Sequence, residues 1–176
     1  LMRFTITGRN IEVTQGLREA VEDKLGKLDR FFVPATEAVV RLSVQKDIQK
    51  IEVTIPVKGH IIRAEESSSD MYVSIDLVEE ILERQLKKYK NKLIDKKQSA
   101  PSFSEAFLQE DASAEEEIQI VKSKKFAVKP MDPEEACVQM ELLGHNFYVF
   151  LNADTEEVNV VYKRKGGTYG LIEPEF

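Results

Sequence analysis

The sequence is poor in the residues from which most metal and redox sites are built. It holds one cysteine, two histidines and no tryptophan among 176 residues. A single cysteine excludes an internal disulfide and suits a reducing compartment. His60 and His145 fall in different halves of the chain, so we expect no metal site and no cofactor. Cys137 falls on an apolar helical pattern and is expected to be a core residue.

Long apolar runs and phosphate-binding loops are also missing. No stretch approaches the roughly 20 apolar residues of a membrane span, and we find no signal-peptide core at the N-terminus. Leu1 stands ahead of Met2, which suggests that the natural chain starts at Met2. Neither GxxxxGK[ST] nor GxGxxG occurs, because KGGTYG at 165–170 has the wrong spacing. We therefore expect a cytoplasmic protein that is not an enzyme and has neither a small-molecule substrate nor a membrane partner.

The net charge of -6 is distributed unevenly along the chain. Residues 1–98 carry a net charge of +2, residues 99–117 of -6 and residues 118–176 of -2. The middle stretch is rich in Ser, Ala and Glu and has no regular apolar period, although it contains a small apolar spot at Phe103, Phe107 and Leu108. We predict two domains, 2–97 and 118–176, joined by an acidic flexible linker, 98–117, that is either extended or docked.

The first domain shows strand and helix periodicities in a clear order. RFTITG at 3–8 alternates like a strand, and apolar residues from Thr14, a candidate N-cap, to Phe32 repeat at helical spacing. Three further strand patterns and a long helix capped by Asp70 follow. Each strand is apolar on one face, so both helices should cover one side of a four-stranded sheet. We predict an α+β fold in the order β-α-β-β-β-α, closer to a double-stranded RNA-binding domain than to an RRM, whose sheet carries aromatic residues.

A strongly basic stretch ends this domain. RQLKKYKNKLIDKK at 84–97 holds seven basic residues and one acid. On a helix, most of these cations point away from the apolar stripe, and the first helix adds others beside them. Such a surface attracts phosphates, although a solvated helix face with its basic end at the negative pole of the dipole is the simpler alternative. The predicted RNA-binding set is Lys24, Lys27, Arg30, Arg84, Lys87, Lys88, Lys90 and Lys92.

The second domain reads as β-α-β-β-β. IQIVKSKKFAV at 118–128 has a strand pattern, and a helix begins at Asp132-Pro133 and stops at Gly144. The next strand, NFYVFLN at 146–152, is apolar on both faces, whereas one helix can cover only one face. We predict that the other face pairs with a second copy of the chain, the alternative being an unusually apolar surface. The predicted dimer interface consists of Phe147, Tyr148, Phe150, Val160 and Tyr162.

Several stretches resemble the ribosome hibernation promoting factors, a family of ribosome-associated translation inhibitors. The segments FTITGRNIEVTQGLREAVEDKLGKLDRFF at 4–32 and DMYVSIDLVEEILERQLKKYKNKL at 70–93 resemble the domain common to the family. In order, KPMDPEEA, QMELLGHNF, NVVYKRK and YGLIE, between residues 129 and 173, resemble the C-terminal extension of its long form.

The resemblance implies that the first domain binds ribosomal RNA of the small subunit near the decoding centre and blocks mRNA and tRNA. It also implies that the second domain dimerises and pairs ribosomes in stationary phase or starvation. Basic positions of the family are matched by Lys24, Lys27, Arg84, Lys88 and Lys90. Ile81 stands where short-form relatives often carry Lys, so that contact is either missing or replaced by Lys87. The alternative is a dimeric adaptor whose RNA-binding-like domain has a protein target. A small-molecule enzyme lacks any convergent polar site.

Overall fold

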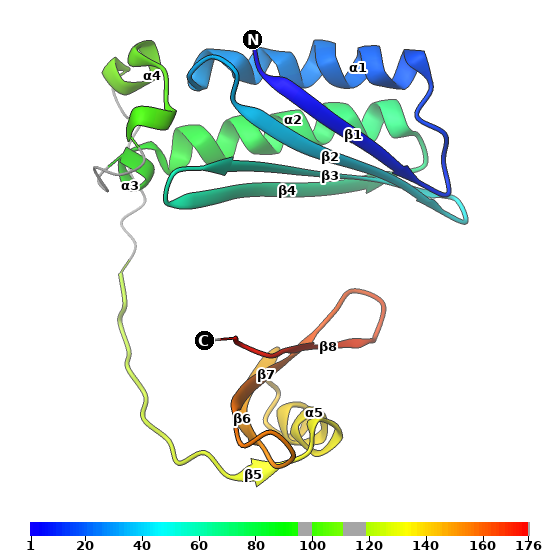
Figure 1. Cartoon of the computed structure of the whole chain (residues 1–176). Coiled ribbons are helices and arrows are strands. Elements are labelled where there is room, and N and C mark those ends of the chain that lie inside the picture. Colours follow the sequence, from blue (N-terminus) through cyan, green and yellow to red (C-terminus); the bar gives the residue numbers. More distant parts are fainter. Residues whose placement is uncertain (95–99, 111–118, 176) are drawn as a thin grey trace. The chain divides into compact units, whose positions relative to one another are not determined.

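The computed structural model describes residues 1–94, 100–110 and 119–175. The chain divides into two compact units, Leu1–Ile118 and Gln119–Phe176, and each is described by itself (Figure 1). Both units combine a four-stranded sheet with helices, so the predicted α+β class is confirmed. None of the helices within the described ranges is long and apolar enough to cross a membrane.

The sheet of the first unit follows the order β1-β2-β3-β4. β1 runs parallel to β2, and the other two strand pairs are antiparallel. A parallel pair needs a crossover, which α1 and the short 3-10 helix η1 provide, and α2 follows β4. The predicted order of elements is confirmed. The bounds are β1 Arg3–Arg9, α1 Gln15–Gly26, η1 Lys27–Phe31, β2 Glu37–Gln45, β3 Ile48–Val57, β4 His60–Ser68 and α2 Met71–Lys88.

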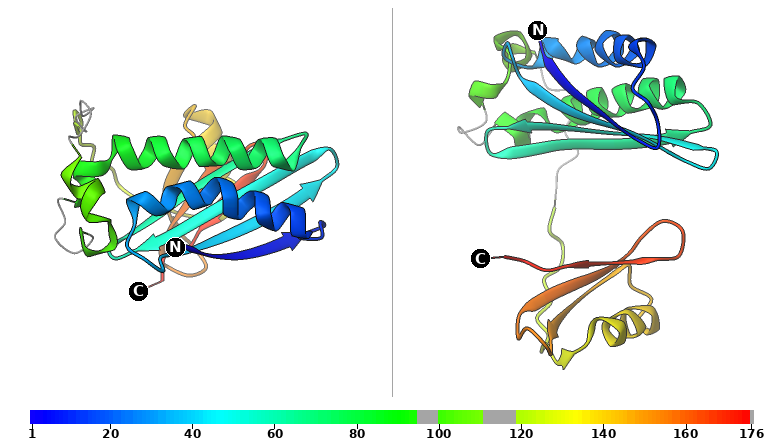
Figure 2. Two further views of the ribbon diagram at one scale, coloured as in Figure 1. Left: turned by 90° about the horizontal axis from the view of Figure 1, so that it is seen from above. Right: turned by 45° about the vertical axis from the view of Figure 1, so that its right-hand side comes forward.

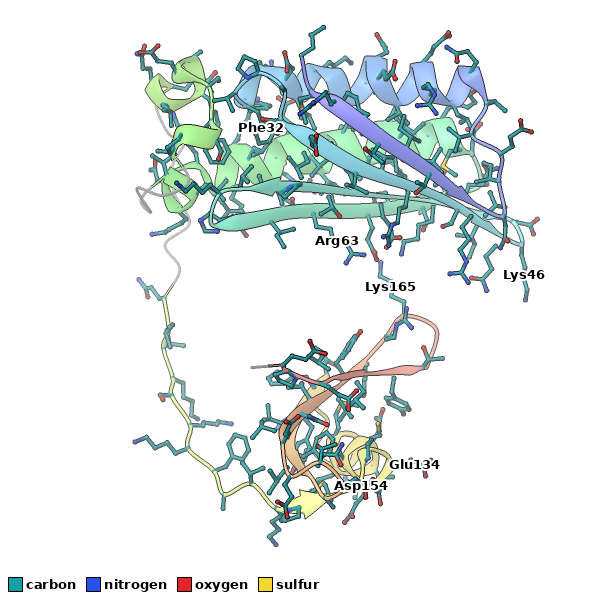
Figure 3. All side chains as sticks on the ribbon, in the orientation of Figure 1. Phe32, Lys46, Arg63, Glu134, Asp154 and Lys165 are labelled. Atoms are coloured by element: carbon teal, nitrogen blue, oxygen red, sulfur yellow. The ribbon has the colours of Figure 1, made fainter. Side chains whose placement is uncertain are left out.

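Both long helices, α1 and α2, lie side by side on one face of this sheet (Figures 1 and 2). The strand residues below them are apolar and buried, as are the α2 residues at helical spacing, Ile75, Val78, Leu82 and Leu86. The opposite face of the sheet is mostly polar, with Ile48 and Ile61 as exposed apolar exceptions. Figure 3 shows Arg63 projecting from it, where Arg63 pairs with Glu52 at 2.7 Å.

Each of the two long helices begins at the N-cap that the sequence predicts. The Thr14 hydroxyl accepts a hydrogen bond from the backbone N–H of Leu17 at 3.3 Å. The Asp70 carboxylate accepts one from the N–H of Tyr72 at 2.8 Å. These N–H groups have no acceptor within their own helix, so each cap fixes the residue at which the helix starts.

The helix expected to continue past Leu93 is interrupted at Tyr89. α2 ends at Lys88, Tyr89 leaves the helical region (φ -104°, ψ 13°), and α3 spans Lys90–Ile94. As a result Tyr89 is exposed, whereas Lys90 is buried. The apolar repeat of the sequence runs through this break without a gap, so periodicity alone does not reveal it.

Part of the expected linker is folded onto the first unit. Residues 100–110 contain the 3-10 turn η2, Ala100–Ser102, and the helix α4, Glu105–Gln109. Phe103 and Phe107 from this stretch are buried in the core of the first unit. The expectation of a flexible segment therefore does not hold for these residues, and the docked alternative does. The remaining linker positions, 98, 99 and 111–117, lie outside the described residues.

The second unit has the sheet order β5-β6-β7-β8 with α5 against one face. The β-α-β-β-β order is confirmed, and Asp132 caps α5 through the N–H of Glu135 at 2.8 Å. The strand predicted over 118–128 is wrong, because residues 119–129 are exposed and pair with no strand. The first residues of this unit that pair with β6 are Pro130 and Met131. The bounds are β5 Pro130–Met131, α5 Pro133–Leu142, β6 Phe147–Asn152, β7 Val158–Lys163 and β8 Tyr169–Ile172.

Candidate functional site

Basic and acidic side chains meet along the line where α1 and η1 lie beside α2. This line is called the α1–α2 seam. Lys24 lies in the last turn of α1, Lys27 and Arg30 lie on η1, and Lys87 lies in the last turn of α2. The fold thus brings together cations that stand about 60 positions apart in the sequence, as predicted from the two helical patterns. The seam comprises Lys24, Lys27, Arg30, Asp76, Glu79, Glu83 and Lys87.

Carboxylates of α2 pair with the seam cations. The Lys24 Nζ lies 2.8 Å from Asp76 Oδ1, and one oxygen of Glu83 lies 2.5 Å from both the Arg30 guanidinium and the Lys87 ammonium. The hydrogen bond from Lys87 and the charge of Arg30 hold the pKa of Glu83 below its usual value. The seam is therefore a paired surface rather than a purely cationic one. The four-residue spacing of Glu83 and Lys87 was a visible signal for one of these pairs; the Arg30–Glu83 pair depends on tertiary structure.

The pKa values of two other seam residues, Lys24 and Glu79, are also shifted. The hydrogen bond with Asp76 raises the pKa of Lys24. Burial raises the pKa of Glu79, against the opposing charge of Lys27. The neighbouring carboxylates of Glu83 and Glu80 act in the same direction as burial.

Further exposed cations lie beside the seam, together with Lys27 of the seam itself. Arg84 and Lys88 are one helical turn apart on α2 and both are exposed, as are Lys27 on η1 and Lys92 on α3. The ammonium of Lys88 lies 5.6 Å from the centre of the Tyr89 ring. Exposed cations on η1, α2 and α3 can meet several phosphates at once.

Lys90 does not belong to this surface, which corrects the predicted binding set. Its side chain is 4% exposed and its ammonium donates a hydrogen bond to the backbone carbonyl of Glu110. The same ammonium lies 5.3 Å from the centre of the Phe107 ring. The break at Tyr89 turns Lys90 inward, so its charge is used within the first unit.

A second candidate surface is the face of the β5–β8 sheet that α5 leaves uncovered. Directly paired residues share a face, and the pairs Phe147–Tyr162, Val149–Val160 and Leu151–Val158 lie on this one. Ile172 of β8 pairs with Val160 and extends the same face. Phe147 is 62% exposed, so a large apolar group is left in contact with water. We define the uncovered face by Phe147, Val149, Leu151, Val158, Val160, Tyr162 and Ile172.

Two of the predicted interface residues lie on the other side of this sheet. Phe150 is fully buried beneath α5 with Ala136 and Met140, and Tyr148 packs against the same cluster. Phe150 is therefore a core residue, and neither residue is part of the uncovered face. Both faces of β6 are apolar in sequence, so only the position of the helix distinguishes them. Val149, Leu151, Val158 and Ile172 were missed for the same reason.

Cys137 and Glu141 have structural partners in the second unit. Cys137 packs against the core of the second unit, and burial raises the pKa of its thiol. Glu141 on α5 pairs with Lys163 at 2.9 Å and accepts a hydrogen bond from the Tyr169 hydroxyl at 2.9 Å. Within residues 1–94, 100–110 and 119–175, no cluster of His, Cys, Asp and Glu is arranged to hold a metal ion.

Comparison with known proteins matches both units to one family. The family described as sigma 54 modulation protein / S30EA ribosomal protein matches residues 4–94, and the C-terminus described for the same family matches residues 115–171. A structure from Coxiella burnetii titled as a ribosomal subunit interface protein shares 29% identity and covers 51% of this chain and 98% of its own, with a TM-score of 0.46.

Full-length relatives are more similar. The ribosome hibernation promotion factor of Lactococcus lactis subsp. cremoris is 48% identical over 99% of this chain and 100% of its own. The proteins of the same name from Staphylococcus aureus and Bacillus subtilis are 43% and 44% identical, over 98% of this chain and 98% and 99% of their own. The chain therefore belongs to the sigma 54 modulation protein / S30EA ribosomal protein family and carries both of its domains, as the long ribosome hibernation promotion factors do.

Proposed function

We propose that this chain is a ribosome hibernation factor whose first unit binds ribosomal RNA of the small subunit and whose second unit pairs two ribosomes. The relatives named ribosome hibernation promotion factor, at 43–48% identity, support the hibernation role and a non-enzymatic mode of action. Binding at the decoding region would exclude mRNA and the anticodon ends of tRNA, so translation would stop.

The observation that carries the RNA assignment is the set of exposed cations on η1, α2 and α3, at and beside the α1–α2 seam. Phosphates that approach these cations release counterions, which favours binding without base-specific contacts. Arg30 and Lys87 are held by Glu83, so a phosphate must compete with that carboxylate for them. The exposed cations Lys27, Arg84, Lys88 and Lys92 are proposed to make the principal contacts.

The observation that supports pairing is the uncovered face of the β5–β8 sheet. A homodimer buries the same patch on both partners, and an apolar sheet face is self-complementary in this way. Pairing two second units would then connect the ribosomes that the two first units occupy.

Sedimentation of ribosomes through sucrose gradients tests both parts. Ribosome pairs should form with the full chain and not with residues 1–110, which should still bind single ribosomes. The fragment ends at 110 because Phe103 and Phe107 belong to the core of the first unit. Ribosome pairs formed by the fragment would contradict the role of the second unit.

A charge-reversal pair separates RNA binding from general electrostatics. Lys27→Glu with Arg84→Glu should abolish ribosome binding, whereas the matched pair Arg9→Glu with Arg41→Glu, at exposed positions on the opposite face of the sheet, should not. Equal losses in both variants would contradict the assignment to the helical surface.

The salt dependence of binding distinguishes RNA from a protein target. If about five phosphates are contacted, log affinity should fall with log salt at a slope of roughly -3.5 to -4.5. A flat response would instead favour a dimeric adaptor whose first unit binds a protein.

A further inference from the structure

Residues 100–110, here called the arm, cover one end of the first unit. They follow α3 and lie against η1, and an isolated β-bridge joins Phe103 to Phe32 (Figure 1). Figure 3 shows Phe32 at this end of the unit. The arm is thus a packed part of the first unit, although its sequence has the composition of a linker.

Aromatic packing holds the arm in place. The Phe107 ring meets Phe31 edge-on with centroids 5.1 Å apart, and the Phe103 ring stacks on Phe32 at 5.7 Å. All four rings are buried. Docking of the arm thus removes from water its own two phenylalanines together with Phe31 of η1 and Phe32, the C-cap of η1. Aromatic pairs in these geometries add to the hydrophobic gain of burial.

Hydrogen bonds pin the arm at both ends. At its start, the Ser102 carbonyl accepts from the N–H of Val33 at 3.2 Å, and the Ser104 N–H donates to the Phe31 carbonyl at 2.9 Å. At its end, the buried ammonium of Lys90 donates to the carbonyl of Glu110. A lysine is rarely buried unless its charge is partnered, and here its partner is the last residue of the arm.

We propose that the surface formed by Phe31, Phe32 and Lys90 is an interaction site whose partner is the chain's own arm, and that this contact sets how far the second unit can reach. With the arm docked, Glu110 is the last residue that described contacts hold on the first unit. With the arm released, that last residue is Ile94.

Covalent geometry gives the size of the effect. An extended chain spans at most about 3.5 Å per residue, so Glu110 and Pro130 can be separated by at most about 70 Å. Without the arm, the same limit measured from Ile94 is about 125 Å. The docked arm thus nearly halves the maximum reach. The idea that the docked arm fixes the spacing of two paired ribosomes rests on the proposed function. The docking of the arm onto the first unit does not.

Hydrogen exchange of the full chain tests whether the arm is docked on the first unit. The amides of residues 100–110 should be protected in the wild type. In the variant Phe103→Ala with Phe107→Ala they should exchange about 100-fold faster or more, because large-to-small changes of buried phenylalanines are strongly destabilising. Peptides from β2, β3 and β4 should stay protected and so report that the unit remains folded. Arm amides that exchange like an unfolded peptide in the wild type would overturn the proposal.

Energy transfer between two dyes tests whether the docked arm limits the distance between the two units. Dyes are placed at Glu19→Cys in α1 and Ala153→Cys after β6, in a Cys137→Ser background, and labelled chains are diluted with unlabelled ones so that only distances within a chain are read. Releasing the arm should lower the mean transfer efficiency. The matched control Phe126→Ala, an exposed phenylalanine of residues 119–129, should leave it unchanged. Equal efficiencies in the released variant and the wild type would overturn the effect on reach. No ribosome takes part, so a failure of ribosome pairing would count against the proposed function alone.

Discussion

Replacing Phe147 by alanine is the sharpest test of the uncovered face. Phe147 begins β6 and its ring is 62% exposed, whereas Phe150, three residues later, is fully buried under α5. Phe147→Ala should therefore leave the second unit folded and weaken the homodimer. Phe150→Ala should instead unfold the unit, at about 3–5 kcal/mol, and so cannot test the interface.

The size of the effect follows from the exposed area. A buried phenylalanine removes about 150–250 Å² from water, so the exposed part of Phe147 offers on the order of 100 Å². At about 25 cal/mol per Å², that area contributes about 2.5 kcal/mol in each protomer. A symmetric dimer uses it twice, which gives about 5 kcal/mol as an upper figure, or between three and four powers of ten in Kd.

The assay is sedimentation velocity of the full chain at roughly 0.1 to 100 μM, a range over which such a change in Kd is visible. Leu142→Ala is the matched control, because Leu142 is 77% exposed but lies on α5, away from the uncovered face. The wild type and Leu142→Ala should sediment as dimers, and Phe147→Ala as monomers over most of the range. A monomeric wild type, or a Phe147→Ala chain as dimeric as the control, would refute the reasoning.

Three further predictions concern stability. The folded-state pKa of Glu83 lies below its unfolded value of about 4.3, so its ion pairs stabilise the chain above that pH and lose their effect as pH falls through the folded pKa; Glu83→Gln should lower the free energy of unfolding by about 1 kcal/mol at pH 7 and by nearly nothing at pH 3, as urea titrations would show. A Cβ on Gly170 would lie 2.4 Å from the Tyr162 ring, which is the far end of a half-buried side chain and can move aside, so Gly170→Ala should cost about 1 kcal/mol or less by thermal unfolding, and less still in a Tyr162→Ala background. A Cβ on Gly8 would lie 2.3 Å from the Ile11 carbonyl oxygen, so Gly8→Ala should destabilise the first unit, whereas Gly26→Ala, where nothing lies within 4 Å, should not.

The sequence predicted the elements well where local chemistry decides them. Three helices start at the caps Thr14, Asp70 and Asp132. In each case the side-chain oxygen of the cap accepts a hydrogen bond from a backbone N–H two or three residues later, so the signal is local. The one-sided strands of the first unit likewise placed both helices on one face. In these cases the information lies within a few residues of the feature.

The errors arose where a distant segment decides the outcome. Lys90 is buried because the arm supplies the Glu110 carbonyl and the Phe107 ring, neither of which the helical period contains. Phe150 and Phe147 look alike on a strand that is apolar on both faces, and only the packing of α5 separates them. Residues 119–129 alternate like a strand but have no strand beside them.

The place of Phe103 and Phe107 in the core of the first unit also governs when that core can be completed during synthesis. The hairpins β2–β3 and β3–β4 join neighbouring segments and can form early, because their contacts are local. The rings of Phe31 and Phe32 must wait until residue 107 has been made. The nascent chain therefore carries a partly uncovered aromatic surface until the start of its own interdomain segment emerges, and full burial of the first unit's core depends on sequence that composition alone would assign to the tether.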